Sequence, residues 1–318
     1  MKISKVGFVG LGAMGSVMSP LLVKAGYQVF GYDIIANIDE SSGVKQLDTL
    51  DDFAQFDAVI FMLPNSKIVS EVVTKLLEIN IKSILIDMSS SDPRETKKLG
   101  KIIEAEGLKF LDAPVSGGVS RAKTGDLMIM AGGDEEDILE VNDLLSIMGT
   151  VQYAGPLGSG HAIKALNNYV SAAGLIASFE ALTTARSFGI KPENFLKIIN
   201  GATGKNNTTE VKLDKFVVSE KFNSGFALDL MVKDVSIAHS LIKVLSSDNP
   251  LSNDVRNYLS KSLDLLGGNP ETGASINFKP LELIILPSFF VSRGSLEDMS
   301  IKIDLVFISN NLVTTSDT

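Results

Sequence analysis

The feature that most constrains how this chain folds is a glycine pattern between an expected strand and an expected helix. The apolar run KVGFVG predicts a short strand, and AMGSVMSPLLVKAG has the spacing of a helix that closes at Gly26. Between them Gly10, Gly12 and Gly15 are spaced as G-x-G-x-x-G. The first glycine permits a tight turn, the second lets the backbone approach a pyrophosphate, and the third lets helix and strand pack closely. The pattern predicts a dinucleotide site at a helix N-terminus.

An acidic residue completes this pattern. Asp33 ends the next expected strand, YQVFGYD, a little more than about 20 residues beyond the glycines. Its carboxylate can accept hydrogen bonds from both ribose hydroxyls of NAD and would repel the additional phosphate of NADP. We therefore expect NAD as the cofactor, with NADP disfavoured. The whole loop is expected to contact it: Gly10, Leu11, Gly12, Ala13, Met14 and Gly15.

Strand-like and helix-like segments alternate through the first half of the chain. The further expected strands are DAVIFML, SILIDM, LKFLDAP, DLMIMAGG and TVQYAG. This alternation predicts an α/β fold, a Rossmann-type doubly wound parallel sheet with helices on both faces. Strand-like runs nearly vanish after about residue 157, which predicts an all-helical C-terminal domain. The expected boundaries are 1–157 for the NAD-binding domain, 158–280 for a substrate and oligomerisation domain, and 281–318 for a tail to which we assign no function.

Composition narrows the functional classes. With 318 residues the chain is long enough for two domains. A net charge of −9 without clustered Lys and Arg disfavours nucleic acid as a partner. There is no cysteine, which removes disulfides and thiolate chemistry, and we expect no metal site. No run of about 18 apolar residues predicts a membrane span, and the N-terminus does not resemble a signal peptide, so we expect a cytoplasmic protein.

A nicotinamide enzyme that oxidises an alcohol needs a side chain to take the hydroxyl proton as the hydride leaves. The two histidines, His161 and His239, are not expected near a strand end of the first domain, so a histidine mechanism fits poorly. None of the five tyrosines is followed four residues later by lysine, so a Tyr-x-x-x-Lys pair is absent. Lysine remains as the plausible proton carrier.

The segment GHAIKALNNYV, residues 160–170, offers such a lysine on an otherwise apolar helix. Lys164 and Asn168 are four residues apart and share one face, while Leu166 belongs to the apolar faces. Desolvation would disfavour the charged form of Lys164 and suit it to proton transfer. Alternatively the ammonium group reaches solvent along its aliphatic stem, and spacing alone leaves both interpretations open. Asn167 points about 100° away around the helix and is expected to serve packing.

Four segments, GFVGLGAMG, FLDAPVSGGVSRAKTGDLMIMAGG, GSGHAIKALNN and ALDLMVKD, occur in this order over about residues 4–245. They resemble the successive motifs of the β-hydroxyacid dehydrogenases. That family includes 3-hydroxyisobutyrate dehydrogenase, tartronate semialdehyde reductase and, more distantly, 6-phosphogluconate dehydrogenase. The resemblance implies that Lys164 is the catalytic acid/base and that Asn168 holds the substrate.

The same resemblance implies further site residues. Ser116, Gly117 and Gly118 match the loop that binds the substrate carboxylate, although without the family they would pass for an ordinary turn. Contacts with the cofactor are assigned to Leu63, Pro64, Ser90 and Lys233.

Two of these assignments have structural alternatives. The cluster around Ser90 is equally suited to cap a helix. Lys233 could instead form a salt bridge with Asp234 or lie on a solvated helix face.

The sequence thus predicts an NAD-dependent oxidoreductase of a small 3-hydroxy acid resembling 3-hydroxyisobutyrate. The alternatives are a reductase of the same family with another substrate, such as tartronate semialdehyde, and a non-catalytic NAD-binding regulatory protein. The long helix expected over about 161–188 should run between the domains. The resemblance also suggests a homodimer or homotetramer formed through the helical half.

Overall fold

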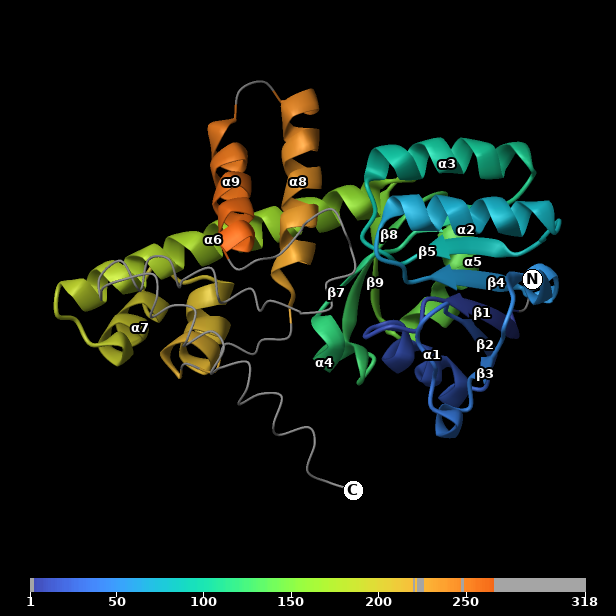
Figure 1. Ribbon diagram of the computed structural model, residues 1–318, viewed down its shortest axis with the longest axis horizontal. Coiled ribbons are helices and arrows are strands. Elements are labelled where there is room, and N and C mark those ends of the chain that lie inside the picture. The colour runs from blue at the N-terminus through green and yellow to red at the C-terminus, as the bar shows by residue number, and fades with distance from the viewer. Residues whose placement is uncertain (1–2, 220, 222–225, 247–248, 266–318) are drawn as a thin grey trace. The chain divides into compact units, whose positions relative to one another are not determined.

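The computed structural model describes residues 3–219, 221, 226–246 and 249–265 (Figure 1). Within this part, the contacts divide the chain into two compact units. The first unit contains residues up to 169 together with 234–249, and the second contains 170–233 together with 250–265. The predicted tail, 281–318, lies outside the described residues, as does the end of the predicted helical domain, 266–280.

The first unit is built on one sheet of nine strands among the residues described. The strands are β1 (Lys5–Val9), β2 (Gln28–Tyr32), β3 (Lys45–Gln46), β4 (Ala58–Phe61), β5 (Ile84–Asp87), β6 (Phe110–Asp112), β7 (Val115–Ser116), β8 (Leu127–Gly132) and β9 (Gly149–Gly155). Their order is β3-β2-β1-β4-β5-β6-β8-β7, and β9 also pairs with β8. All neighbours are parallel except β6 with β8 and β7 with β8.

Helices cover both faces of this sheet. They are α1 (Gly15–Lys24), α2 (Ser66–Glu78), α3 (Pro93–Ala105), α4 (Gly118–Ala122) and α5 (Glu135–Ser146), with short 3-10 helices η1 (Glu40–Ser42) and η2 (Leu50–Gln55). Figure 1 shows α2 and α3 on one side of the strands and α1 on the other. The predicted Rossmann-type fold is confirmed.

The alternation of side chains along each strand explains why both faces need cover. In β4, Ile60 joins a core completed by α1, α4 and α5, whereas Val59 and Phe61 join a second core completed by η2, α2 and α3. All four residues of this strand are buried. Strands buried on both faces give the continuous apolar runs from which they were predicted.

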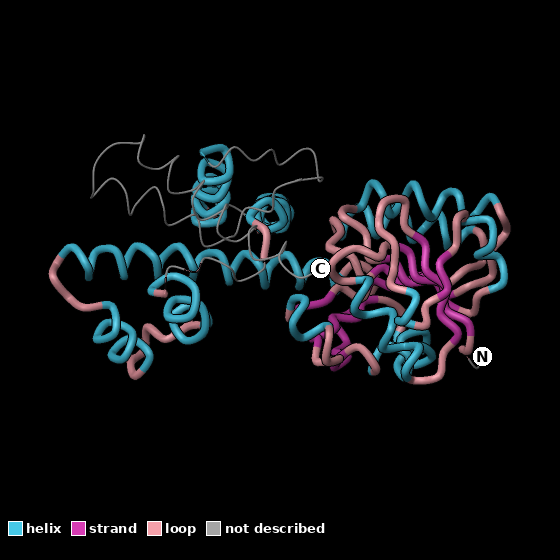
Figure 2. The backbone as a smooth tube through the Cα atoms, turned by 60° about the horizontal axis from the view of Figure 1, so that its bottom comes forward, coloured by secondary structure: helices cyan, strands magenta, loops and turns pink. Residues whose placement is uncertain are grey.

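The second unit is helical in its described part, which confirms the predicted all-helical C-terminal half (Figure 2). Its elements are part of α6 (Ser159–Ser187), α7 (Pro192–Asn200), the π-helical η3 (Thr208–Val218), part of α8 (Leu228–Leu245) and α9 (Pro250–Leu265). The chain passes from one unit to the other inside α6 and again inside α8. No described helix is long and apolar enough to cross a membrane.

The third glycine of the loop has a packing role that can be tested. A methyl group at Gly15 would overlap the carbonyl oxygen of Gly10, whereas a methyl group at Gly12 would meet no atom within 4 Å. Gly15→Ala should therefore destabilise the protein by about 1–3 kcal/mol, because α1 must move away from β1. Gly12→Ala is the matched control and should unfold at nearly the wild-type urea concentration. Equal unfolding curves for the two variants would refute this packing role.

Candidate functional site

The glycine loop lies at the carboxyl end of β1, where the parallel strands present their connecting loops. The backbone of Gly10 has φ 99°, a left-handed conformation suited to glycine, and its N–H donates to the Tyr32 carbonyl at 2.9 Å. Helix α1 begins directly after the loop, and its N-cap residue, Met14, makes no side-chain capping bond. Ser16 N already donates to the Gly12 carbonyl at 3.0 Å, and Val17 N and Met18 N donate to the Met14 carbonyl. What this end of α1 offers a phosphate is the positive end of the helix dipole beside the glycine loop, which fits a dinucleotide.

Asp33 fastens the loop to the end of β2. Its Oδ2 accepts from Leu11 N at 2.7 Å, and its Oδ1 accepts from Ile35 N at 2.8 Å and Ala36 N at 2.9 Å. An ionised carboxylate offers about four acceptor positions, so these three bonds leave about one free. The carboxylate is held in place beside the glycine loop and retains about one acceptor position. Its bonds to the ribose hydroxyls stay a prediction.

The loops after β4 and β5 are bonded to each other. Leu63 N donates to Ser89 Oγ at 2.9 Å, while Pro64 is exposed beside it. Ser90 Oγ donates to Asp234 Oδ1 on α8 at 2.7 Å. Of the two roles considered for this serine cluster, capping belongs to Asp92, which caps α3 through a bond from Arg94 N. Ser90 connects the β5 loop to α8.

Helix α6 carries the predicted lysine and asparagine. Asn168 is buried, and its Nδ2 donates to Asp234 Oδ2 at 2.6 Å. Lys164 lies one turn before it and is half-buried. Asp234 thus accepts from both Ser90 and Asn168, and it ties α6 to the loop after β5.

One expectation about this helix is wrong. Asn167 is exposed and does not serve packing; its Nδ2 donates to Asn168 Oδ1 at 3.1 Å and orients that amide. Leu166, which was assigned to the apolar faces, is 39% exposed, and nearby Ile163 and Val170 are 43% and 67% exposed. Over residues 161–170 the buried positions are His161, Ala165 and Asn168, so this part of the helix is buried on one side only.

The start of α6 is anchored by a carboxylate at the end of β6. Asp112 Oδ1 accepts from Gly158 N at 2.6 Å, and Oδ2 accepts from His161 N at 2.7 Å. Side chains at Gly132 or Gly160 would collide with this carboxylate, so both positions need glycine. Burial raises the pKa of the Asp112 carboxyl, while the His161 ring and the two backbone bonds counteract part of that rise.

The expectation that neither histidine lies near a strand end is wrong for His161. Its ring is buried between the carboxyl ends of β5 and β6, with Nδ1 2.8 Å from Thr96 Oγ1. The sequence placed His161 at the start of the helical half, but contacts place the first turns of α6 in the first unit.

The predicted anion loop follows β7. Ser116 is half-buried, and Gly117 and Gly118 are exposed with φ of 140° and 67°. A methyl group at Gly117 would press on Arg121, whereas Gly118 faces open space. The two glycines thus place an exposed stretch of backbone at the start of α4.

Lys233 lies on α8 directly before Asp234 and is half-buried. Asp234 bonds to Ser90 and Asn168. Three polar residues of this region were not predicted from the sequence: Asp234, Asp112 and His161. Asp234 directly follows Lys233 in the segment ALDLMVKD, so this segment already contained a signal for Asp234.

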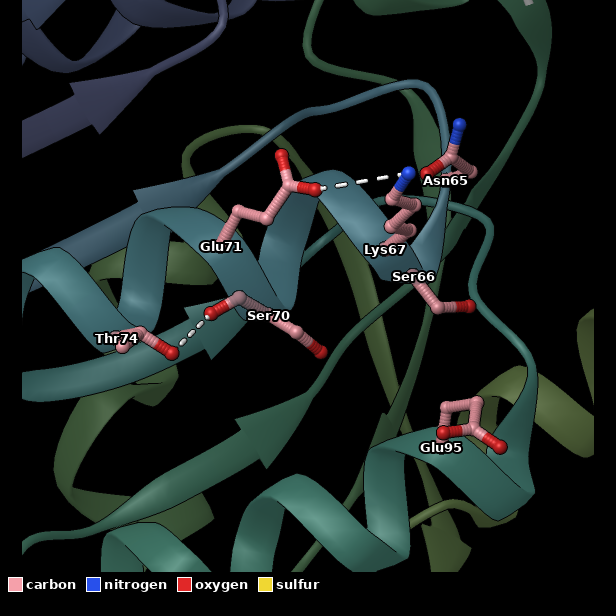
Figure 3. Close-up of a pocket in the computed structure, with 7 residues that line it drawn as sticks. All are labelled: Asn65, Ser66, Lys67, Ser70, Glu71, Thr74 and Glu95. Atoms are coloured by element: carbon pink, nitrogen blue, oxygen red, sulfur yellow. Dashed lines mark hydrogen bonds and ion pairs between the residues drawn. The ribbon is translucent and has the colours of Figure 1, made fainter.

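A separate polar groove runs beside α2 (Figure 3). Figure 3 shows Lys67 and Glu71 facing each other on α2, with Nζ and Oε1 3.9 Å apart. None of the predicted site residues lines this groove. Its lining is Asn65, Ser66, Lys67, Ser70, Glu71, Thr74 and Glu95.

The glycine loop, the acid after β2 and the polar set on α6 together define a nicotinamide-dependent dehydrogenase with a Rossmann-type domain. Comparison with known protein families agrees. Residues 5–155 match the family described as the NAD-binding domain of 6-phosphogluconate dehydrogenase. Residues 158–277 match the family described as NAD-binding of NADP-dependent 3-hydroxyisobutyrate dehydrogenase.

Individual relatives are similar over most of their length. The chain is 35% identical over 243 residues to 2-(hydroxymethyl)glutarate dehydrogenase of Eubacterium barkeri, covering 74% of this chain and 81% of that protein. It is 36% identical over 248 residues to mitochondrial 3-hydroxyisobutyrate dehydrogenase of Rattus norvegicus, covering 73% and 74%. A solved structure of Mycobacterium tuberculosis 3-hydroxyisobutyrate dehydrogenase with L-serine superposes with TM-score 0.81 at 28% identity, covering 92% of this chain and 100% of that one.

The chain therefore belongs to the β-hydroxyacid dehydrogenase family. It is a nicotinamide-dependent dehydrogenase acting on CH–OH groups, and its substrates are of the hydroxy-acid class.

The buried Asp112 gives a prediction about pH. A carboxyl whose pKa is raised by folding contributes stability that is present below its unfolded value, near 3.8, and is lost as pH rises through the folded value. Asp112→Asn removes this titration, although it also weakens the anchor of α6. The free energy of unfolding of the wild type relative to the variant should therefore fall as pH rises above about 4. Urea unfolding of both proteins across this range measures the difference, and a difference that grows with pH would contradict the assignment.

Proposed function

We propose that this protein oxidises a small 3-hydroxy acid resembling 3-hydroxyisobutyrate, with NAD as the cofactor and Lys164 as the general acid/base. The observation that carries this proposal is the position of Lys164 on α6, one turn from Asn168 and one turn from the Asp112 anchor. The nicotinamide, when bound, accepts the hydride from the substrate carbon and returns it in the reverse direction. The residues of this chain bind, orient and exchange the proton.

Lys164 exchanges that proton at Nζ. The half-buried side chain extends from a helix whose next turn holds the buried Asn168. In the oxidative direction the neutral amine accepts the proton of the substrate hydroxyl, and in reduction the ammonium group returns it. A position between two anchored turns fixes where the amine can reach, and such fixed placement is a large part of catalysis.

Asn168 holds the substrate and is itself held. Its Nδ2 donates to Asp234, and its Oδ1 accepts from Asn167. An amide Nδ2 has two donors, so one remains for the substrate after the bond to Asp234. Substitution of Asn168 should for this reason impair substrate handling more than cofactor binding.

The substrate carboxylate is assigned to Ser116, Gly117 and Gly118. The two exposed glycines lack side chains that would keep an anion from the backbone N–H groups, and Ser116 adds a hydroxyl donor. The relatives named above act on hydroxy acids, which carry such a carboxylate. This agreement supports 3-hydroxyisobutyrate and similar acids as first substrates to assay.

The proton-transfer role of Lys164 is tested by substitution. General acid/base groups typically contribute about 10²–10⁴-fold to the rate, so Lys164→Met should lower kcat for 3-hydroxyisobutyrate oxidation by at least about that factor. NADH binding, followed by fluorescence titration, should stay nearly unchanged.

Lys101→Met is the matched control, because Lys101 is an exposed residue of α3. This control should retain wild-type kcat. Near-normal turnover of the Lys164→Met protein would place the proton carrier elsewhere.

The preference for NAD depends on Asp33. Its carboxylate retains about one acceptor position for a ribose hydroxyl and would repel a 2′-phosphate. One family description matched by the second half of the chain names NADP, so the choice needs a direct measurement. The geometry of the glycine loop supports a dinucleotide cofactor, and Asp33 supports NAD over NADP.

Asp33→Asn should narrow or reverse the preference. Losing a charge-assisted hydrogen bond costs about 1–3 kcal/mol, which corresponds to roughly 5- to 150-fold in the ratio of kcat/KM for NAD over NADP. The ratio is measured for both cofactors with the wild type and the variant. A wild-type enzyme that already uses NADP more efficiently than NAD would show that Asp33 does not select the cofactor.

The homodimer or homotetramer expected from the family resemblance stays a prediction, as do the cytoplasmic location and the boundaries of the domains.

A further inference from the structure

Three buried ionisable side chains form a cluster that the proposed reaction does not use. His161, Asp87 and Asp112 each expose no more than 1% of their surface. Asp87 ends β5, Asp112 ends β6, and His161 lies in the first turn of α6. Helix α3 adds the hydroxyl of Thr96, whose Oγ1 is 2.8 Å from His161 Nδ1.

His161 Nδ1 faces the first carboxylate, that of Asp112, and Thr96 Oγ1 lies 2.8 Å from this nitrogen. The Thr96 hydroxyl is also within hydrogen-bond distance of the Asp92 carbonyl, at 3.1 Å, and when it donates there its oxygen can accept from Nδ1. A proton on Nδ1 is in addition attracted to the carboxylate of Asp112. The same nitrogen lies 3.6 Å from Asp112 Oδ2.

The other ring nitrogen faces the second carboxylate. His161 Nε2 lies 3.7 Å from Asp87 Oδ2 and has no hydrogen-bond partner among the described residues. A lone pair on Nε2 would be repelled by the carboxylate oxygen, whereas an N–H there is attracted to it. Asp87 already accepts from Ser89 N and Ser91 Oγ, and Asp112 accepts from two N–H groups of α6.

Burying two carboxylates that act as hydrogen-bond acceptors costs folding free energy unless a cation lies close to them. We propose that His161 carries a proton on both ring nitrogens and acts as a positioning residue, an imidazolium held between Asp87 and Asp112. The charged groups facing the ring are Asp87 from β5 and Asp112 from β6, and α3 contributes the neutral Thr96.

The cluster connects two parts of the candidate site. Asp112 holds the start of α6, which carries Lys164. Asp87 orients the Ser89–Ser91 segment, whose central Ser90 bonds to Asp234. His161 joins the two carboxylates, so its charge holds α6 against the loop after β5. The catalytic consequence rests on the proposed function, whereas the protonation state rests on the geometry alone.

Nitrogen-15 NMR of the full-length protein labelled in histidine tests the protonation state directly. The chain has two histidines, so two ring patterns are expected, and His239→Gln assigns them. Near neutral pH both ring nitrogens of His161 should show the shifts of N–H groups. A ring nitrogen of His161 with the downfield shift of an unprotonated nitrogen would overturn the proposal, whatever the role of Lys164.

Kinetics test the positioning role. His161→Gln should lower kcat at least about tenfold while leaving the KM for NAD nearly unchanged, because small displacements of catalytic groups are costly. Adding Asp87→Asn removes one uncompensated carboxylate and should recover part of kcat, which a mere packing role would not produce. His239→Gln is the control and should keep wild-type kcat. Unchanged kcat in His161→Gln, or no recovery in the double variant, would refute positioning. If His161→Gln does not fold, the wild-type NMR spectrum decides.

Discussion

The site depends on one interaction, the pair of short bonds from the start of α6 to the Asp112 carboxylate. Gly158 N and His161 N donate to it at 2.6 and 2.7 Å. The positive end of the helix dipole meets a negative charge at the end of a central strand, which favours the pairing. Gly132 and Gly160 leave the space that the carboxylate occupies. A long helix is thereby fixed at its first turn to the sheet, and Lys164 and Asn168 follow within the next two turns.

A second set of bonds fixes the same helix further along. Asp234 on α8 accepts from Asn168 and from Ser90, and Ser90 belongs to the loop that Asp87 orients. The loop after β5 neighbours the loop after β4 through the bond between Leu63 and Ser89. Ser90, which is assigned to the cofactor, and Asn168, which is assigned to the substrate, thus bond to the same carboxylate. We infer that a substitution at either anchored turn changes the position of Lys164, which lies between them.

Much of this fold could be predicted from sequence, because strands buried on both faces leave apolar runs and the glycine loop has a fixed spacing. Strands β3 and β7 were not predicted, because a strand of two residues is too short to show an alternating pattern of apolar side chains. The exposure of Asn167 and Leu166 could not be predicted, since it depends on which side of α6 is covered. Asp112 and Asp234 were missed for another reason: their partners lie 46 to 144 positions away in the chain, and spacing says nothing about such pairs.

The central claim, that an amine at position 164 exchanges the substrate proton, can be tested by chemical replacement. The chain contains no cysteine, so Lys164→Cys introduces a single thiol. Alkylation with 2-bromoethylamine rebuilds a lysine-like amine there, whereas iodoacetamide adds a similar bulk without an amine. The measurement is kcat for 3-hydroxyisobutyrate oxidation. The account predicts that the cysteine variant is nearly inactive and that only aminoethylation restores a large part of kcat. Full activity before alkylation, equal recovery with both reagents, or no recovery with the amine would contradict it.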